Sequence, residues 1–394
     1  MRVMALGRVA NDLNVLDGKR RNFVGIQLGS AMAAEGYETT GLQTGNEAVV
    51  AHKTGPNHAT VAEDDGVVTA IEAGYVEVTY GTGKSAFVKR YATGRQFGRH
   101  EGTVFPHDIV ANVKLKQKVA KGTVLTYNEA FFEPSIIDPT QVLWKAGVMA
   151  TVALLEGIDT LDDSSACSIE LSKKLGAKTT KVEHIRLRFD QAIHDLVKEG
   201  ETVDIDTVLC TIEDALTAST AAFKEESRNV LSQIESLSPR AGVGGSIDRI
   251  EIFYNGELED ATESVAALIK AGDRRRKKEA KADPLSADNG RVTSAFRVEG
   301  IPVELNTVLI RLYITKVSEA IGGDKVVFAN QMKSTFRRRM TGINMTESGI
   351  PLDAYFGSKS IDERIVESAK IIAVTNVCTR LEAEKCQAIY RKGG

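Results

Sequence analysis

The chain lacks the features that would place it in a membrane or outside the cell. Its 394 residues contain no run of about 18 apolar residues, so we expect no membrane-spanning helix and no membrane partner. The first residues, Met1 to Gly7, lack the long apolar core of a secretory signal. The 4 cysteines form no Cys-x-x-Cys pair and the 6 histidines are scattered, which argues against zinc in this chain. Reduced, buried thiols in a cytosolic protein fit this pattern.

A large excess of one charge is also missing. The chain has 53 acidic and 50 basic residues and a formal net charge of −3. It is therefore no general polycation, and any contact with nucleic acid must come from local patches. Its composition, 42% hydrophobic and 26% charged, is that of a soluble globular protein, and its length predicts about one to three domains.

One basic patch lies between Lys325 and Thr346, where no acid occurs. Lys325, Lys333 and the three consecutive arginines at 337–339 supply positive charge there. Clustered Lys and Arg attract phosphate whatever the nucleic-acid sequence, so this stretch predicts a polyanion site. A solvated basic loop beside a strand is the alternative interpretation.

Three other basic stretches each leave two interpretations open. Arg20 and Arg21 either point at phosphate or begin a charged helix. Residues 84–100 interleave basic and aromatic side chains, which suits a nucleic-acid groove or an exposed basic hairpin. Residues 274–278 are all basic and indicate a solvated helix end or a nucleic-acid contact.

Hydrophobic periodicity predicts most of the secondary structure. Alternation at period two predicts a hairpin of strands 66–71 and 75–80, and a strand at 308–314. Residues 83–85, Gly-Lys-Ser, form a tight turn and no phosphate-binding loop, because Val78 stands where that motif requires glycine. Further expected elements are a buried strand 147–157, strand–glycine turn–strand units of a small barrel at 113–125 and 197–209, helices 213–237, 259–270 and 361–390, and a loop at 283–290.

Three acids, Asp159, Asp162 and Asp163, follow the expected buried strand 147–157. Adjacent carboxylates can hold Mg²⁺ directly or through water, because hard cations prefer oxygen ligands. Aspartates in this position also serve as turn residues and helix caps. The spacing alone leaves both roles open.

In order along the chain, these landmarks resemble the C-terminal half of the β subunit of multisubunit DNA-dependent RNA polymerases, of the split type encoded by giant bacteriophages. The resemblance covers nearly the whole chain. It is carried by Arg20-Arg21 with Gly25, by Lys118 to Leu125, by Asp162-Asp163-Ser164 with Ser168, by the eight-residue separation of Lys325 and Lys333, and by Pro351-Leu352-Asp353 with Arg364 eleven residues after Asp353.

Two departures from the family pattern are specific. The acid pair is Asp-Asp rather than Glu-Asp and lies one residue further from Gly157. The glycines and histidine that separate the two lysines in the family are replaced by Val-Val-Phe-Ala-Asn-Gln-Met.

The resemblance implies an α+β, β-rich fold with three regions. Residues 1–180 would hold the RNA–DNA hybrid-binding region and the first part of a double-psi β-barrel. Residues 181–300 would form an inserted flap, or wall, domain. Residues 301–394 would complete the barrel, with the phosphate-binding lysines and a C-terminal helix.

The resemblance also implies a nucleotidyltransferase subunit that is inactive as an isolated chain. Lys325 and Lys333 would bind the RNA 3′ end, Arg364 and Arg21 the incoming nucleotide, and Asp162 and Asp163 would serve the second Mg²⁺, directly or through water. The catalytic Mg²⁺ would be held mainly by a β′-like partner, because no triple-aspartate loop occurs here. A separate N-terminal β-like subunit, DNA template, RNA and NTPs complete the expected partners, in the cytoplasm of an infected host cell or in the virion.

Two other functions stay open at this point. A non-enzymatic nucleic-acid-binding or virion structural protein would use the basic patches only to hold nucleic acid. A stand-alone Mg²⁺ phosphohydrolase would use Asp159, Asp162 and Asp163, although no general base or nucleophile accompanies these acids.

Overall fold

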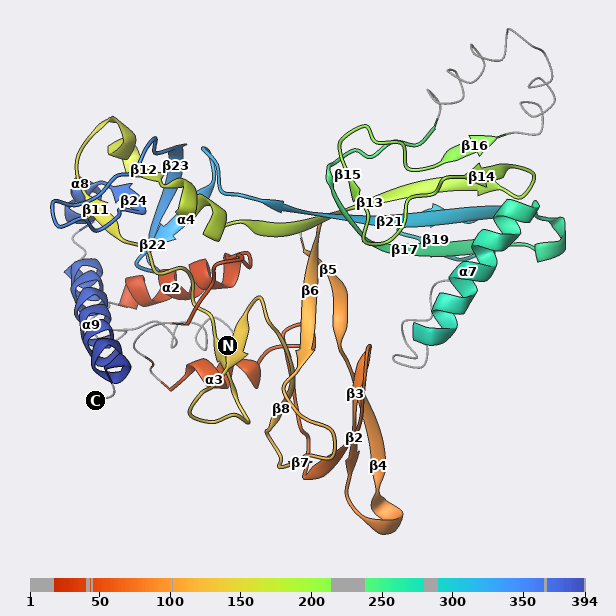
Figure 1. Ribbon diagram of the computed structural model, residues 1–394, viewed down its shortest axis with the longest axis horizontal. Helices are drawn as coiled ribbons and strands as arrows, with labels where there is room; N and C mark the ends of the chain where they lie inside the picture. The colour runs from red at the N-terminus through yellow and green to blue at the C-terminus, as the bar shows by residue number, and fades with distance from the viewer. Residues whose placement is uncertain are drawn as a thin grey trace, which may run out of the picture.

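The computed structural model describes residues 18–39, 43, 45–100, 102–213, 238–279, 290–364 and 367–392. These residues form a mixed α+β, β-rich fold, as expected. Figure 1 shows long strands that cross from a unit at one end to a unit at the other, with hairpins that project from the middle. The expected helix 213–237 and loop 283–290 lie outside the described residues, apart from Glu213 and Gly290.

Two long strands connect the two end units (Figure 1). β13 (Ala177–Arg188) and β21 (Thr307–Ser318) pair antiparallel along their full 12-residue length, and β17 (Gly245–Asn255) pairs with the other edge of β21. Alternate β21 residues from Val308 to Ile314 are completely buried in one core, which confirms the predicted strand. Tyr313, on the opposite face, is buried as well, so this strand is covered on both sides.

The unit at one end of these strands contains described residues from the range 181–300, which the sequence predicts as an insertion. Its core is covered by α7 (Glu263–Glu279), which buries Val265 and Ile269. The boundary at 181 falls inside β13, and the boundary at 300 falls between two short strands. The remaining strands are β14 (Ala192–His194), β15 (Thr202–Val203), β16 (Thr211–Glu213), β18 (Gly290–Arg291), β19 (Arg297–Val298) and β20 (Ile301–Pro302).

The middle of the molecule consists of antiparallel hairpins. β2 (Gly66–Glu72) and β3 (Tyr75–Tyr80) form the predicted hairpin, and Gly83–Ser85 form the predicted turn, here a single 3₁₀ turn. Val76, Val78 and Tyr80 alternate into the core. The neighbouring strands are β1 (Ala59–Val61), β4 (Phe87–Ala92), β5 (Gly94–His100), β6 (Thr103–Ala111), β7 (Lys118–Val119), β8 (Val124–Asn128), β9 (Phe132–Pro134) and β10 (Val142–Trp144).

The first predicted strand–glycine turn–strand unit forms as β7, a turn at Gly122 and β8; in the second, residues 197–200 lie outside any strand and β15 follows. β7 pairs with β2, whereas β8 pairs with β1 and β6, so the strands on either side of Gly122 do not pair with each other. In the second unit β15 pairs with β17, and Val208 forms an isolated bridge with Arg240. Gly122 has a φ of 87°, and its turn passes the chain from one sheet to another.

The other end unit is a mixed five-stranded sheet in the order β11-β24-β12-β23-β22. Its strands are β11 (Val152–Leu154), β12 (Ser164–Cys167), β22 (Lys325–Phe328), β23 (Met332–Arg339) and β24 (Ala354–Phe356). The expected buried strand 147–157 is wrong in length and burial: only β11 forms, and as an edge strand it is half-buried to exposed. No sheet closes into a barrel within the described ranges.

Helices from both ends of the described chain cover this sheet. α2 (Gly18–Ser30) and α9 (Glu367–Arg391) lie close together (Figure 1), and Val24 packs against Ile372. The predicted helix 361–390 is divided into α8 (Ser358–Asp362) and α9. The other short helices are α3 (Glu47–Ala51) and α4 (Ile169–Lys174).

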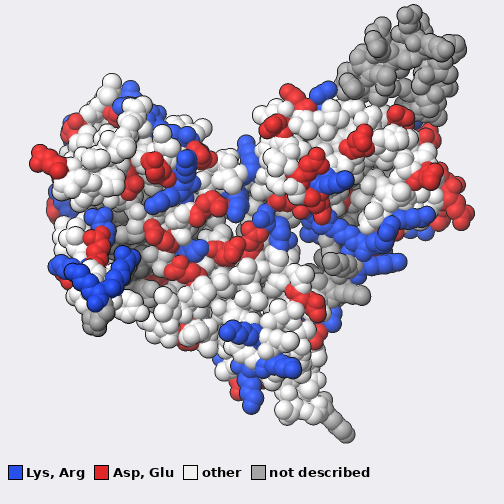
Figure 2. All heavy atoms as spheres, viewed as in Figure 1, with Lys and Arg blue, Asp and Glu red and all other residues white. Residues whose placement is uncertain are grey.

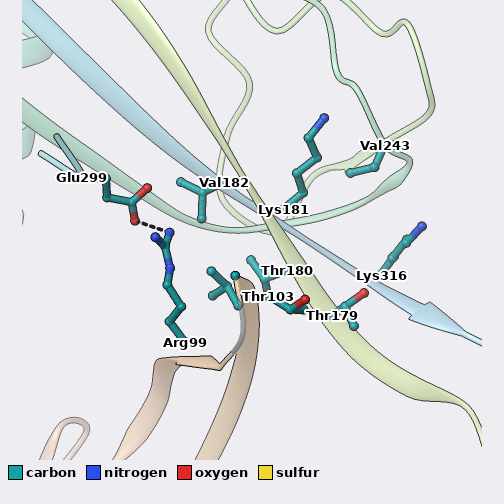
Figure 3. Close-up of a pocket in the computed structure, with 11 residues that line it drawn as sticks. Arg99, Thr103, Thr179, Thr180, Lys181, Val182, Val243, Glu299 and Lys316 are labelled. Atoms are coloured by element: carbon teal, nitrogen blue, oxygen red, sulfur yellow. Dashed lines mark hydrogen bonds and ion pairs between the residues drawn. The ribbon is translucent and has the colours of Figure 1, made fainter. Parts of the chain in front are cut away.

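β5 braces the middle of the molecule against the long strands. Arg95 forms an ion pair with Asp248, Phe97 stacks on Tyr313 at 4.3 Å between ring centroids, and Arg99 Nη2 lies 2.7 Å from Glu299 Oε1. Alternate residues of a strand share a face, so one face of β5 makes all three contacts. Figure 3 shows the Arg99–Glu299 pair, which lines a cavity. The cavity has a volume of about 360 Å³, and its lining includes three cations, three threonines and the acid Glu299.

No helix in the described ranges is long and apolar enough to cross a membrane. Cys167 and Cys210 are buried, as expected, but Cys378 and Cys386 are exposed on α9, so the expectation of four buried thiols is wrong.

Candidate functional site

The two lysines predicted to bind phosphate share one exposed face of the β22–β23 hairpin. Lys325 lies opposite Thr335, and Val327 lies opposite Lys333. Residues opposite each other in an antiparallel pair point to the same face, and diagonal neighbours are about 7–8 Å apart. Both lysine side chains are exposed, and neither forms an ion pair with any residue that the structure describes. The hairpin thus holds two available cations side by side.

A tight turn sets this geometry. Gln331 N donates to Phe328 O at 3.2 Å, and both residues between them, Ala329 and Asn330, have a left-handed backbone with φ of 48° and 58°. Turns of this kind match the twist of a hairpin. Met332, Ser334 and Phe336 alternate inward on β23 and are buried, which leaves Lys333 on the outer face.

The acid pair lies beside this hairpin. Asp162 and Asp163 end a short 3₁₀ segment, Ile158–Asp163, and both have a left-handed backbone, with φ of 50° and 62°. Aspartate adopts this conformation more readily than most residues. Ser334 Oγ donates to Asp163 O at 2.7 Å, so the residue next to Lys333 on β23 anchors the acid pair. Parallel pairing of β12 with β23 continues from this point.

Arg364 closes the site from the segment that follows α8. Its Nη2 forms an ion pair with Asp163 Oδ2, and its Nη1 donates to Ser360 O at 2.9 Å. The two partners are 201 positions apart in the sequence. The pair is only partly shielded, with 24% of the Arg364 side chain and 48% of the Asp163 side chain exposed.

α2 brings a second arginine to the same place. Arg20 Nη2 lies 3.5 Å from Arg364 O, at the limit of a hydrogen bond, and its guanidinium lies 5.4 Å from the Phe23 ring centroid. Gln27 Nε2 lies 3.4 Å from Gln331 O, which holds α2 against the lysine hairpin. Arg21, which the resemblance named, is exposed on the same helix.

The three arginines at 337–339 do not belong to the open part of the site. Arg338 donates two hydrogen bonds to the Asp159 carboxylate, and Arg337 donates to Ile158 O. Arg339 Nη1 lies 3.1 Å from Glu319 Oε2. The predicted polyanion stretch is therefore divided: its lysines face solvent, whereas its arginines hold the protein together.

Asp159 is separated from the other two acids by its partner. Only 13% of its side chain is exposed, and the hydrogen bonds from Arg338 lower its pKa below the ordinary value. A carboxylate held in this way is not available as a third ligand beside Asp162 and Asp163. This arrangement disfavours a hydrolase that uses all three acids.

The donor set for a divalent ion is small. No group of three or more His, Cys, Asp or Glu side chains that could hold a metal occurs within the described ranges. Asp162 and Asp163 offer carboxylate oxygens, which suit Mg²⁺, but Mg²⁺ requires about six ligands. Any Mg²⁺ here would need phosphate oxygens, water or carboxylates from another chain to complete its coordination.

The basic stretch 84–100 contains cations that have protein partners. Lys89 pairs with Glu63 and Arg90 with Glu77, and the arginines of β5 brace the long strands. β4 is exposed over most of its length, as the exposed-hairpin interpretation expects, and its cations are paired with acids.

α7 differs, because it carries exposed cations over its outer face. Lys270, Arg274 and Lys277 are exposed at spacings of four and three, and none forms an ion pair with a residue that the structure describes. Figure 2 shows blue side chains gathered over α7. Arg275, in contrast, pairs with Glu199. The expected helix 259–270 begins later, at Glu263, and continues through the basic residues 274–277.

No protein-family model matches the chain, and no curated protein matches it either. The geometry described above and the resemblance of the sequence motifs are therefore what argue for a function.

Proposed function

We propose that this chain is a subunit of a DNA-dependent RNA polymerase, the C-terminal part of a split β subunit of the kind encoded by giant bacteriophages. The observation that supports this most is the position of Lys325 and Lys333. They lie on one face, without an ion pair to any residue that the structure describes, beside a segment in which Asp163 and Arg364 meet. Two exposed cations on one face suit contacts to backbone phosphates, which Lys and Arg side chains commonly make.

In the proposed reaction, the RNA 3′ hydroxyl attacks the α-phosphorus of a nucleoside triphosphate and pyrophosphate leaves. Lys325 and Lys333 hold backbone phosphates at the RNA 3′ end, which fixes the attacking group. Arg364, with Arg20 of α2 beside it, binds the triphosphate and neutralises the charge on the departing pyrophosphate. Such transfer is catalysed mainly by positioning and electrostatics, so a subunit without the catalytic metal can still contribute to the rate.

Magnesium would supply the remaining positive charge. When bound, it neutralises phosphate oxygens and activates the 3′ hydroxyl. Asp162 and Asp163 would orient the second ion, directly or through water. A β′-like partner would hold the catalytic ion with a triple-aspartate loop, and a separate N-terminal β-like subunit would complete the assembly on the DNA template.

The proposal includes the finer description of the fold and location. The lysine hairpin and the five-stranded sheet would be the part of this chain that enters a double-psi barrel with the hybrid-binding region. Residues 181–300 would be the flap, or wall, insertion. The enzyme would work in the cytoplasm of the infected host cell or be carried in the virion.

The direct test is to identify what this chain assembles with. The tagged full chain is purified from its natural source, and the proteins that elute with it in equal molar amounts by gel filtration are identified by mass spectrometry. We expect a partner with a triple-aspartate loop and DNA-directed RNA synthesis by the complex. A chain that elutes alone, without RNA synthesis, would contradict the proposal.

A nucleic-acid-binding or virion structural protein is the second candidate, and the cations on α7 favour it. Such a protein would bind nucleic acid through charge alone, with an affinity that falls steeply with salt. Replacement of Lys270, Arg274 and Lys277 by Gln would then abolish binding by the isolated chain, whereas Lys325→Gln with Lys333→Gln would have little effect. The polymerase proposal instead expects Lys325→Gln with Lys333→Gln to weaken binding of an RNA 3′ end more than the α7 substitutions do.

A further inference from the structure

Arg364, which the proposed function assigns to the triphosphate, already forms an ion pair with a carboxylate of its own chain. Arg364 directs Nη2 to the Asp163 carboxylate and Nη1 to the carbonyl oxygen of Ser360. A phosphate that approaches this guanidinium therefore meets a carboxylate in the place it would take. The pair forms between two segments that are distant in sequence, so it is a tertiary contact and not a local turn.

We infer that Asp163 is a displaceable stand-in for substrate phosphate: its carboxylate occupies Arg364 until a polyphosphate replaces it. The chemical class of the ligand, a polyphosphate chain, rests on the proposed function; the occupied state of Arg364 is a property of this chain alone. Asp163 thereby acts through Arg364 and determines how much free energy an anion must supply to bind there.

The exposure of the two side chains makes this exchange feasible. With 48% of the Asp163 side chain and 24% of the Arg364 side chain exposed, water screens their attraction, and pairs of this kind are weak. Guanidinium binds phosphate oxygens in the same two-pronged geometry as carboxylate, and a polyphosphate brings several charges where aspartate brings one. The carboxylate is therefore the weaker competitor.

The backbone of Asp163 stays in place while its side chain leaves. Its carbonyl oxygen accepts the hydrogen bond from the buried Ser334 hydroxyl, and Ser334 lies 2.7 Å from the hydroxyl of Ser165. Displacement therefore needs only rotation about side-chain bonds into solvent. Asp162, one residue earlier, is exposed and forms no ion pair with any described residue, so it is a natural control.

The test is a calorimetric titration of the full chain with inorganic tripolyphosphate, with EDTA present and at about 0.15 M salt to screen distant charges. Wild type is compared with Asp163→Asn and Asp162→Asn. Both substitutions remove one negative charge, and asparagine tolerates the left-handed backbone at both positions. We expect Asp163→Asn to tighten binding about threefold to fivefold, the equivalent of a weak surface pair. Asp162→Asn should change the affinity for tripolyphosphate by less than about twofold, because salt screens the charge that this substitution removes.

A purely structural ion pair gives the opposite result. If Asp163 only held the Arg364 segment in position, Asp163→Asn would loosen the site and weaken binding. In an Arg364→Gln background, where the competition is gone, Asp163→Asn should have no effect on tripolyphosphate affinity. The inference is overturned if Asp163→Asn binds no tighter than Asp162→Asn, including the case in which neither binds, or if the gain persists without Arg364.

This outcome is separable from that of the polymerase proposal. The titration needs no partner chain, nucleic acid or metal, whereas the polymerase proposal is decided by the proteins that elute with the chain. Equal binding by the two aspartate variants would remove the stand-in role and leave the subunit assignment intact. A gain confined to Asp163→Asn, in a chain that elutes alone, would support the anion site and contradict the polymerase.

Discussion

Arg338 and Asp159, 179 positions apart, are joined by two hydrogen bonds, Nε to Oδ1 at 2.8 Å and Nη2 to Oδ2 at 2.7 Å. The pair connects β23, which carries Lys333, to the 3₁₀ segment that ends in Asp162 and Asp163. The geometry of the candidate site thus depends on a pair that lies outside its open part.

The pair predicts a pH-dependent difference in stability between wild type and Arg338→Ala. Arg338 lowers the pKa of Asp159 below its ordinary value of 3.8 in the folded chain. A group whose folded pKa is lowered stabilises the fold above its unfolded pKa and loses that contribution as the pH falls through the folded pKa. Arg338→Ala should therefore melt below wild type at pH 6, and the two melting temperatures should converge below about pH 3.8.

Lys333→Ala is the control for this experiment. Lys333 lies on the same strand but has no ion-pair partner among the described residues. The difference in melting temperature between Lys333→Ala and wild type should stay constant over the same pH range. A gap between Arg338→Ala and wild type that stays constant down to pH 2.5 would show that Asp159 contributes nothing through this pair.

The proposed role of the lysine hairpin predicts a loss of rate without a loss of assembly. Lys325→Ala or Lys333→Ala in the purified polymerase should slow elongation at least about tenfold, since tenfold corresponds to about 1.4 kcal/mol of lost transition-state stabilisation. The rate is measured from pre-formed RNA 3′ ends, and assembly is checked by gel filtration. Lys385→Ala, an exposed lysine on α9, is the control. Wild-type rates from both hairpin variants would remove these lysines from the site.

The buried acid Glu251 predicts a large effect on stability. Arg311 Nε lies 2.7 Å from Glu251 Oε2, Arg249 Nε lies 3.0 Å from Glu251 Oε1, and only 9% of the Glu251 side chain is exposed. Glu251→Ala leaves two shielded arginines without this anion and should cost about 3–5 kcal/mol in the free energy of unfolding, measured by urea. Glu257→Ala, which removes the exposed partner of Arg291, should cost far less. Equal losses of unfolding free energy in Glu251→Ala and Glu257→Ala would show that the buried acid stabilises the fold no more than the exposed one.

The cysteines predict a simple labelling pattern. Burial raises the pKa of Cys167 to about 11 and that of Cys210 to about 12, so both thiols are protonated and shielded at neutral pH. Cys378 and Cys386 are exposed on α9. Iodoacetamide should add two labels to the native chain and four after denaturation, as read by intact mass. A native chain that takes up no label would mean that α9 is covered in solution.

Local patterns predicted the elements whose signals lie within a few neighbouring residues. Strand alternation at 308–314 and 66–80 needs only the side chains of those segments, and both were confirmed. The expected strand 147–157 was wrong because an apolar run does not show whether a strand has neighbours on both edges. β11 has only one.

The site shows the same limit more sharply. The absence of acids between Lys325 and Thr346 predicted an open cationic patch, but the partners of Arg338 and Arg339 lie upstream, at Asp159 and Glu319. Sequence distance hides such pairs.

One signal at α2 was available and was overlooked. Arg20 stands four residues before Val24 and eight before Leu28, on the face that packs against the C-terminal helix, whereas the resemblance named Arg21. The helical spacing of the apolar residues indicates which arginine faces Arg364.

The pairing of Arg188 with Thr307 at the end of β13 and β21 means that the chain returns to the place from which it departed. The chain enters and leaves these 118 intervening residues, the cassette, at neighbouring positions, so they form an insertion between the two paired strands. Length changes and remodelled loops within that cassette therefore leave the register of β22, β23 and β12 untouched. Evolution can vary what lies beyond this junction while the lysine hairpin keeps its form.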